Sequence, residues 1–291
     1  MLILLGVLIL NHDVYNVTFP GLGLSFKVDP IAFTIGSFSV YWYGIIIAVG
    51  FTLALSYCIS RTKKHNIDTD KFTDCIIVGL ITAIIGARAY YVAFSWDKYK
   101  DNLSEIFNVH GGGLAIYGGI IGAVIGGLIM AKIQKVKILP LLDVAAGGFL
   151  IGQGIGRWGN FMNQEAFGSE TSLPWRMVSE GTGGVAVHPC FLYESLWCLI
   201  GVLILHFVVS KRQRYNGQLM YFYLVWYGFE RTIVEGLRAD SLYLPFADIR
   251  VSQLISLVMV IVGVVMLIIH RKTADECFVE AADSADTEKA E

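Results

Sequence analysis

Seven charged side chains lie inside long apolar stretches of this sequence, and they are the first candidates for chemistry. They are Arg88, Asp143, Arg157, Glu194, Glu230, Arg231 and Glu235. A charge is costly in a hydrocarbon environment, so an ionisable residue in such a stretch is a functional candidate by default. Arginine is suited to phosphate, because its planar fork can bind two oxygens at once. The residue types therefore favour a site for an anionic group.

The three arginines among these charges have different predicted partners. Arg231 and Glu235 are four residues apart on one helical face and can form an ion pair, which could equally be only structural. Arg157 has no carboxylate three or four residues away, so a phosphate is its predicted partner. Arg88 is a second candidate phosphate clamp, or it pairs with a glutamate of another helix.

The elements that must position these charges are membrane helices. Hydrophobic residues make up 55% of the 291 residues, charged residues only 16%, and the mean hydropathy is +0.60. Soluble domains carry about 25% charge. This composition excludes a disordered protein and a disulfide scaffold, and the net charge of −2 excludes a nucleic-acid binder. Apolar runs near the length of about 20 residues that spans a bilayer predict helices at 38–59, 74–94, 113–131, 139–161, 190–209, 217–235 and 251–270.

Basic and non-basic loops alternate between these helices, and this alternation predicts the orientation. Lysine and arginine gather in the loops 61–71, 132–137 and 211–214 and at 271–272, whereas the intervening loops lack a basic excess. Because basic loops stay in the cytoplasm, the N-terminus is expected outside and the C-terminus inside. We therefore predict an all-α polytopic membrane protein with seven transmembrane helices and a small extracytoplasmic loop region.

Three segments follow from this topology. Residues 1–37 are expected to form an extracytoplasmic or interfacial segment. Residues 38–270 are expected to form the seven-helix domain, with an extracytoplasmic loop at 160–189. Residues 271–291 are acidic and are expected to be a disordered cytoplasmic tail.

The same topology sorts the intramembrane charges by depth. Six of the seven fall toward the outer leaflet, and only Asp143 falls at a cytoplasmic helix end, where an interfacial charge is the simplest interpretation. An ion or proton pathway would place charges through the full depth. The pattern therefore predicts a polar chamber that opens on one leaflet.

Several familiar motifs are absent or misleading. The pattern G-x-G-x-x-G at 154–159 lies inside an apolar span with no preceding strand, so it does not indicate a dinucleotide site. Gly148, Gly152 and Gly156 recur every four residues instead and indicate close helix packing. No HExxH or GxSxG occurs, and the five cysteines have no metal-ligand spacing. We expect no metal and no cofactor.

One segment is too polar for a structural role alone. Residues 156–165 read G-R-W-G-N-F-M-N-Q-E at the outer end of a membrane helix. This segment resembles the signature G-R-x-G-N-F-x-N-x-E of the prolipoprotein diacylglyceryl transferase family. Further matches are W-Y-G at 42–44, G-A-R at 86–88, G-L-A-I-Y-G-G at 113–119, H-P at 188–189, L-Y-E at 192–194 and Y-G-F-E-R-T-I-V-E at 227–235 with Arg238. The resemblance runs from Tyr41 to Ile269.

The resemblance implies a transfer reaction at the bacterial plasma membrane. Family members move the sn-1,2-diacylglyceryl group of phosphatidylglycerol to the lipobox cysteine of a prolipoprotein. A thioether forms and glycerol 1-phosphate leaves. The expected partners are therefore phosphatidylglycerol, the prolipoprotein signal peptide and membrane lipid, with no nucleic acid, and the active site is expected toward the outer leaflet.

The resemblance also implies roles for individual residues. The catalytic candidates are Arg231, which would stabilise the leaving phosphate or lower the pKa of the thiol, Glu235, which would orient Arg231, and Tyr117. The candidates for substrate binding are Arg157, Asn160, Asn163, Glu165, Arg88, Tyr43, Tyr227, Arg238 and Glu194. Several relatives carry histidine where Tyr117 stands. Tyrosine, with a pKa near 10, is a poor base at neutral pH, so a positioning role is favoured.

Two other classes compete with the transferase. A transporter for a small anion would use Arg88, Arg157 and Arg231 for selectivity, but it predicts polar positions that continue to the cytoplasmic side. A membrane scaffold would not need the polar segment 157–165. Transfer of labelled lipid to a lipobox peptide distinguishes these classes.

Overall fold

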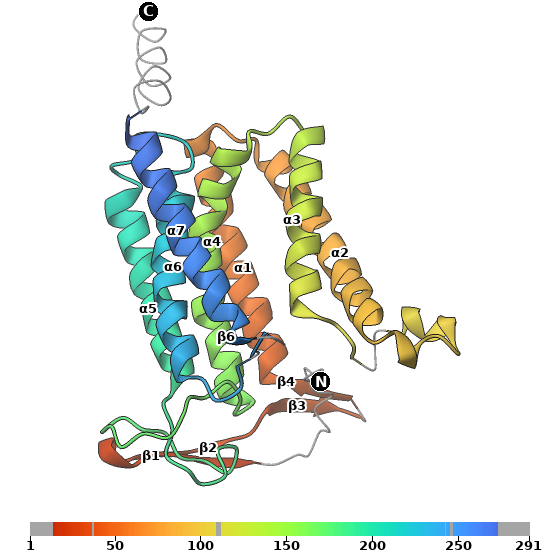
Figure 1. The fold of residues 1–291 in the computed structure, drawn as a ribbon, viewed down its shortest axis with the longest axis vertical. Coiled ribbons are helices and arrows are strands. Elements are labelled where there is room, and N and C mark those ends of the chain that lie inside the picture. The colour runs from red at the N-terminus through yellow and green to blue at the C-terminus, as the bar shows by residue number, and fades with distance from the viewer. Residues whose placement is uncertain (1–13, 37, 109–111, 242, 245–246, 273–291) are drawn as a thin grey trace, which may run out of the picture. The chain divides into compact units, whose positions relative to one another are not determined.

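The computed structural model describes residues 14–36, 38–108, 112–241, 243–244 and 247–272. Its elements fall into two compact units, which are described separately. One unit covers residues 61–141 and is called here the two-helix unit, and the other covers 14–60 and 142–272 and is called the five-helix unit. Figure 1 shows the helices of both units and the small strands that accompany the second.

The two-helix unit is built on α2 (Thr69–Phe94) and α3 (Ile116–Ile133), with short 3-10 turns at Lys63–His65, Trp96–Lys98 and Leu103–Phe107. Asp68 caps α2 by accepting hydrogen bonds from the backbone N–H groups of Asp70 and Lys71, at 2.9 and 3.2 Å. The two helices approach closely at glycines, since a Cβ on Gly86 or Gly118 would strike the other helix's backbone. Close backbone contact through small residues is typical of membrane helices.

The five-helix unit contains α5 (Cys190–Ile204), α6 (Gln218–Leu237) and α7 (Val251–Lys272), together with all of α1 (Trp42–Thr62) except its last two residues and all of α4 (Ile138–Met162) except its first four. A π-helical turn, Leu205–Val209, continues α5. The glycine repeat of α4 faces α1, because a Cβ on Gly148 would strike the Cys58 sulfur and one on Gly156 would lie 3.4 Å from Ile47 Cδ1. The packing role predicted for these glycines is confirmed.

Asp143 has a different role from the one expected of it. The sequence suggested an interfacial charge, but Asp143 is 1% exposed. Its carboxylate accepts hydrogen bonds from the backbone N–H groups of Gly217 and Met220, at 2.6 and 3.0 Å, and from Gln213 Nε2 at 2.8 Å. The first N–H groups of a helix lack partners within it. Asp143 of α4 therefore caps the N-terminus of α6 and fixes one helix to the other.

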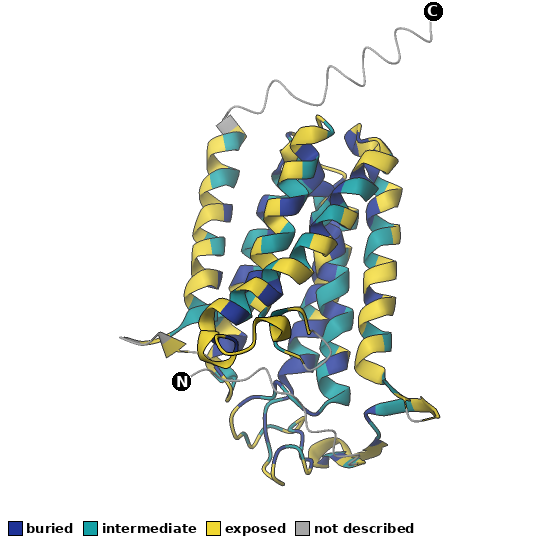
Figure 2. Cartoon of the chain, turned by 90° about the vertical axis from the view of Figure 1, so that its right-hand side faces the viewer, coloured by how far each residue is buried: buried dark blue, intermediate teal, exposed yellow. Residues whose placement is uncertain are grey.

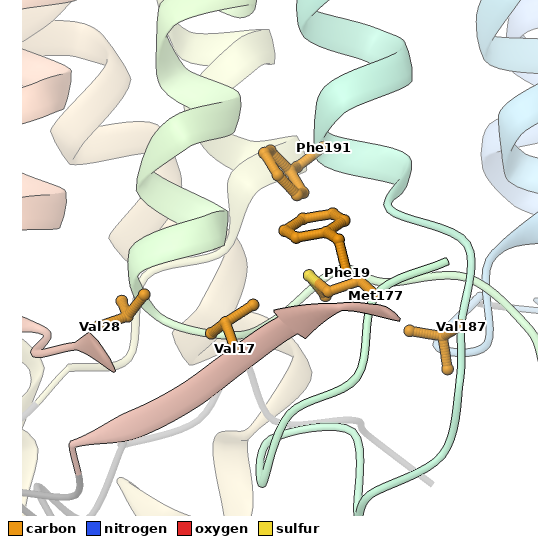
Figure 3. Close-up of a cluster of buried hydrophobic side chains, with 6 residues drawn as sticks. All are labelled: Val17, Phe19, Val28, Met177, Val187 and Phe191. Carbon is orange, nitrogen blue, oxygen red and sulfur yellow. The ribbon is translucent and has the colours of Figure 1, made fainter. Parts of the chain in front are cut away.

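Three antiparallel hairpins accompany the helices in the described part of the chain. The strands pair as β1 (Tyr15–Phe19) with β2 (Leu24–Val28), β3 (Ile31–Ile35) with β4 (Phe38–Tyr41), and β5 (Tyr243–Leu244) with β6 (Ala247–Arg250). The first hairpin continues into the loop after α4 through a backbone pair between Thr18 and Val178. Its buried face and that loop enclose Val17, Phe19, Val28, Met177, Val187 and Phe191 (Figure 3).

The outer faces of the helices remain exposed although their residues are apolar (Figure 2). On α7, for example, Ile261, Val265 and Ile268 are about half exposed. Within the described residues, six helical segments are long and apolar enough to cross a membrane: Trp42–His65, Thr69–Phe94, Ile116–Ile133, Ile138–Met162, Cys190–Val209 and Val251–Arg271. A soluble protein rarely exposes such surfaces. The chain is a polytopic, predominantly helical integral membrane protein.

The structure changes some predicted boundaries. The first helix begins at Trp42, because Phe38–Tyr41 is a strand that pairs with Ile31–Ile35. The described part of the expected N-terminal segment 1–37 contains the hairpin β1–β2 and the strand β3. Residues 1–13 and the tail from residue 273 lie outside the described residues. The sixth predicted span forms α6, but it is not among the six apolar segments, because it carries Glu230, Arg231 and Glu235.

Candidate active site

Four charged side chains from three helices of the five-helix unit form one connected cluster. Arg157 of α4 places Nη2 2.7 Å from Oε2 of Glu194 on α5. The same carboxylate accepts hydrogen bonds from Nη1 of Arg231 on α6, at 3.1 and 3.0 Å. Arg231 Nη2 also lies 2.6 Å from Oε2 of Glu235. We call Arg157, Glu194, Arg231 and Glu235 the arginine–glutamate cluster.

Burial within the cluster is uneven. The side chains of Glu194 and Glu235 are 1% and 2% exposed, whereas those of Arg157 and Arg231 are 18% and 13% exposed. Burying an ionised carboxylate this deeply is costly unless it is paired, and the arginines supply the partners of Glu194 and Glu235. A guanidinium has five N–H donors, so it can hold a carboxylate on one edge and accept a second anion on another. The arginines are therefore the accessible side of the cluster.

The predicted pair of Arg231 and Glu235 is confirmed, since it follows from their spacing on one helix. Arg157 has no carboxylate partner on its own helix, as its spacing indicated, but it does have one on α5. Its partner Glu194 lies in the second turn of α5, where α5 packs beside α4, and no spacing rule within one helix could have found it.

The polar segment after Arg157 folds back on itself at the end of α4. Arg157 Nη1 donates to Asn160 Oδ1 at 3.3 Å, and Asn160 Nδ2 donates to Glu165 Oε1 at 2.9 Å. Asn163 Nδ2 donates weakly to the same oxygen, at 3.4 Å. Gln164 and Ala166 flank Glu165 with positive φ angles of 51° and 58° and turn the chain. Arg157, Asn160, Asn163 and Glu165 are thus brought together as the sequence predicted.

Two tyrosines of the predicted set lie beside this segment. Tyr43 of α1 packs against Gly159, where a Cβ would lie 2.9 Å from the Tyr43 ring. Tyr227 of α6 stacks on Tyr223, with ring centroids 5.6 Å apart and planes 3° from parallel, and it is within reach of the charges of Arg157 and Arg231. Both tyrosines therefore adjoin the cluster.

Glu230 was noted in the sequence as an intramembrane charge but was not assigned to the site. It is 4% exposed, and neither carboxylate oxygen has a hydrogen-bond partner among the described residues. Its charge interacts with those of Glu194, Arg157 and Arg231, so it adjoins the cluster. Its signals in the sequence were its charge inside an apolar span, its depth toward the outer leaflet and its place in the matched segment 227–235.

Arg88 requires a correction. It is buried in the two-helix unit, and its Nε, Nη1 and Nη2 atoms donate five hydrogen bonds to backbone carbonyls. The acceptors, at 2.6 to 3.0 Å, are the carbonyls of Glu105, Ile106, Asn108, Gly112 and Gly113. Since arginine has five N–H donors, none is left for the phosphate predicted as its ligand. Arg88 instead fastens the chain between α2 and α3.

Tyr117 lies in the first turn of α3, also in the two-helix unit, and is half-buried. The chain just before it is tied to α2 by a hydrogen bond of 3.0 Å from Ala115 N–H to the Ala87 carbonyl. Its role in the reaction stays a prediction.

Arg238 follows α6 and forms a two-point ion pair with Asp240. Its Nε and Nη2 donate to the two carboxylate oxygens at 2.9 and 2.7 Å. Partial burial would raise the pKa of Asp240, but the hydrogen bond and the charge of Arg238 outweigh it and lower that pKa. The carboxylate is 54% exposed, so this pair lies at the surface, and the substrate-binding role of Arg238 stays a prediction.

In the part of the chain that the structure describes, no group of three histidine, cysteine, aspartate or glutamate side chains could hold a metal ion. The cluster can act in another way. Two arginines from α4 and α6 converge on one carboxylate, and their remaining donors can stabilise an anion near the helix ends.

The fold and this site define a polytopic membrane protein with a buried arginine–glutamate site. Residues 30–269 match the family model described as prolipoprotein diacylglyceryl transferase, and the chain belongs to this family. It is 45% identical over 245 residues to a phosphatidylglycerol–prolipoprotein diacylglyceryl transferase of Finegoldia magna, covering 84% of this chain and 97% of that one. It is 43% identical over 265 residues to the protein of that name from Bacillus cytotoxicus, covering 87% and 97%. The chain is a transferase enzyme of the membrane, as its sequence predicted.

Proposed function

We propose that this chain transfers the sn-1,2-diacylglyceryl group of phosphatidylglycerol to the lipobox cysteine of prolipoproteins. The observation that carries the proposal is the convergence of Arg157 and Arg231 on Glu194, in a chain of this family. The relatives' names state phosphatidylglycerol and prolipoprotein as their substrates. An anionic lipid head group is the kind of ligand that paired arginines bind.

In the binding step, Arg157 holds the phosphate of the lipid, and its contact with Asn160 exists before the lipid arrives. The contact between Arg157 and Asn160 is long, at 3.3 Å, whereas Asn160 is firmly bonded to Glu165 at 2.9 Å. A phosphate can therefore displace the weak contact without disturbing the turn. Asn163, Tyr43 and Tyr227 complete the walls of the site, and Arg238 lies at its outer edge.

In the transfer step, the cysteine sulfur attacks the glyceryl carbon that carries the phosphate. A carbon–sulfur bond forms, the carbon–oxygen bond breaks, and its electron pair goes to the phosphate oxygen, so glycerol 1-phosphate leaves. The thiol proton passes to solvent or to the released phosphate. Arg231 stabilises the charge that develops on that oxygen, while Glu194 and Glu235 hold Arg231 from two sides.

We also propose an orientation in which the site is reached from outside the cell. We propose that α6 is a seventh span whose charges face the interior, and that the N-terminus lies outside and the C-terminus in the cytoplasm. The alternation of basic loops supports this arrangement in the bacterial plasma membrane. The cluster then opens toward the outer leaflet, where lipid and the signal peptide of an exported precursor meet.

The test is lipidation of a synthetic lipobox peptide by the purified protein in detergent with phosphatidylglycerol. We expect the cysteine to gain the mass of a diacylglyceryl thioether. The same peptide with serine in place of cysteine, or phosphatidylcholine in place of phosphatidylglycerol, should give no product. A folded protein that leaves the cysteine unmodified under these conditions would refute the transferase. Release of an anion from proteoliposomes without lipidation would support the transporter instead, an alternative that no contact described here favours.

A further inference from the structure

Glu230 is the carboxylate of this site that the proposed mechanism does not use. It lies on α6, 4% exposed, between its neighbours Phe229 and Arg231. Both of its oxygens are buried and lack a hydrogen-bond partner among the described residues. Burying a carboxylate without donors costs several kcal/mol or more. A residue held at such a cost in the site needs an explanation.

The groups that face Glu230 come from three helices. Arg157 lies on α4, Glu194 and Cys198 lie on α5, and Tyr227 and Arg231 lie on α6. Among the charged groups, Glu194 has the strongest electrostatic effect on Glu230 and repels its ionised form, while the two arginines attract it. Both arginines, however, are already paired, Arg157 with Glu194 and Arg231 with Glu194 and Glu235.

Formal charges show the consequence. The arginine–glutamate cluster and Glu230 together hold two arginines and three glutamates, and among these three Glu230 is the one without an arginine in direct contact. If all five of these side chains are ionised, the group has one excess negative charge. A phosphodiester brings a further negative charge, and like charges repel strongly where water is excluded. The site can receive the lipid head group without this repulsion only if one carboxylate becomes neutral.

We propose that Glu230 takes up a proton when the anionic head group binds. The proton removes the excess charge and leaves the two arginines for the phosphate. This proposal rests on the proposed function, because it takes the ligand to be the phosphodiester of phosphatidylglycerol. Glu230 acts through the cluster and does not touch the lipid, so it is a positioning residue that tunes the charge of the site.

The experiment measures binding of phosphatidylglycerol to the full chain in detergent micelles, without peptide. The pH runs from about 5.5 to about 8.5, a range in which the phosphodiester does not titrate. We expect the affinity of the unmodified protein for phosphatidylglycerol to fall with rising pH. In the pH range where Glu230 loses its proton, the decrease should approach about tenfold per pH unit. Glu230→Gln keeps the neutral form permanently. Its affinity should be flat over this range and at high pH should exceed that of the unmodified protein.

The matched control is Glu170→Gln, which makes the same charge change at an exposed position of the loop after α4. It should keep the pH profile of the unmodified protein. Phosphatidylcholine, whose head group has no net charge, should show no pH-dependent binding to either protein. A flat profile for the unmodified protein, or an unchanged slope in Glu230→Gln, would overturn the proposal.

Proton uptake gives a second measurement that needs no variant. At the upper end of this pH range, where Glu230 of the free protein is ionised, mixing the unmodified protein with phosphatidylglycerol in weak buffer with an indicator dye should consume up to about one proton per bound lipid. Glu230→Gln should consume none. Binding without proton uptake would overturn the role of Glu230 even if the variant did not fold. Lipidation of the peptide by the unmodified protein in that case would leave the proposed function standing, whereas absence of both binding and lipidation would refute the two together.

Discussion

Arg88 and the arginines of the cluster use the same side chain in two different ways. Arg88 donates all five of its hydrogen bonds to backbone carbonyls between Glu105 and Gly113. Arg157 and Arg231 instead pair with side-chain carboxylates, Glu194 of the neighbouring helix α5 and Glu235 of α6 itself. The first arginine is enclosed by one loop, and the other two join three helices.

The two kinds of arginine differ in whether their hydrogen-bond partners can be replaced by a phosphate. Five carbonyls accept a hydrogen bond from Arg88, so losing the arginine removes a charged donor from all of them at once. A carboxylate and a phosphate are alternative partners for the same guanidinium, so an arginine in a cluster can bind substrate without unfolding its surroundings. We infer that a buried arginine in a membrane protein does not by itself indicate a substrate-binding site. The chemistry of the groups that it pairs with is the better indicator.

The largest expected effect is at Arg231. Arg231→Ala should reduce transfer to the lipobox peptide by about 10³-fold, because it removes the donor that stabilises the leaving phosphate. Arg231→Lys should remain strongly impaired, since one ammonium cannot hold two carboxylates in the geometry of a planar fork. The measurement is the initial rate of peptide lipidation. Arg176→Ala, a change in the loop after α4, is the control and should transfer at nearly the normal rate. Near-normal activity of Arg231→Ala would remove the cluster from the reaction.

Replacing Arg157 should mainly weaken the binding of phosphatidylglycerol. Arg157→Ala should raise the KM for phosphatidylglycerol by about 10- to 100-fold, in line with the loss of a charge-assisted contact with the head group. The KM for the peptide should change little. A variant with an unchanged KM for the lipid would show that Arg157 is only a structural partner of Glu194.

Arg88 provides the opposite test. Arg88→Ala should lower the free energy of unfolding by about 3 kcal/mol, because backbone carbonyls lose a charged donor. The lipid KM of the protein that stays folded should be near normal. Thermal unfolding in detergent, followed alongside the kinetics, separates the two effects. A normal melting temperature with a strongly raised KM would make Arg88 a substrate ligand after all.

Tyr117 should have a moderate effect if it positions substrate. Tyr117→Phe keeps the ring and removes only the hydroxyl, so transfer should fall by about tenfold or less. Single-turnover rates at saturating lipid and peptide measure the step directly. Near-complete loss of transfer in a protein that still inserts and folds would make the hydroxyl a participant in proton transfer.

The helices and the local part of the site could be predicted from the sequence. Apolar runs located the seven α-helices of the described residues within a few residues, and the glycine repeat of α4 indicated close packing against another helix. The pair Arg231–Glu235 followed from a spacing of four. In each case the signal lies within one element, where periodicity fixes which side chains share a face.

The contacts between distant segments could not be predicted in this way. Glu194 is 37 residues from Arg231, and Asp143 is 74 residues from the Gly217 N–H that it caps. Those partners are set by how the helices pack, and one sequence carries no record of that packing. The strands β3 and β4 were also missed, because Phe38–Tyr41 continues directly into the apolar run of α1.

The smallest expected effect is at the exposed ion pair of Arg238 and Asp240, which shows how little such a pair contributes outside the cluster. The pKa of Asp240 is lower in the folded protein than in the unfolded chain, where it is about 3.9. The contribution of Asp240 to stability is therefore fully present above the unfolded pKa and is lost as the pH falls through the folded pKa. Because the carboxylate is 54% exposed, solvent screens the pair, and Asp240→Asn should cost only about 0.5 kcal/mol at neutral pH. Melting temperatures of the two proteins should differ slightly at neutral pH and converge in acid. A difference that persisted at a pH well below the folded pKa would mean that Asp240 stabilises the turn by its shape and hydrogen bonds, with its charge contributing nothing.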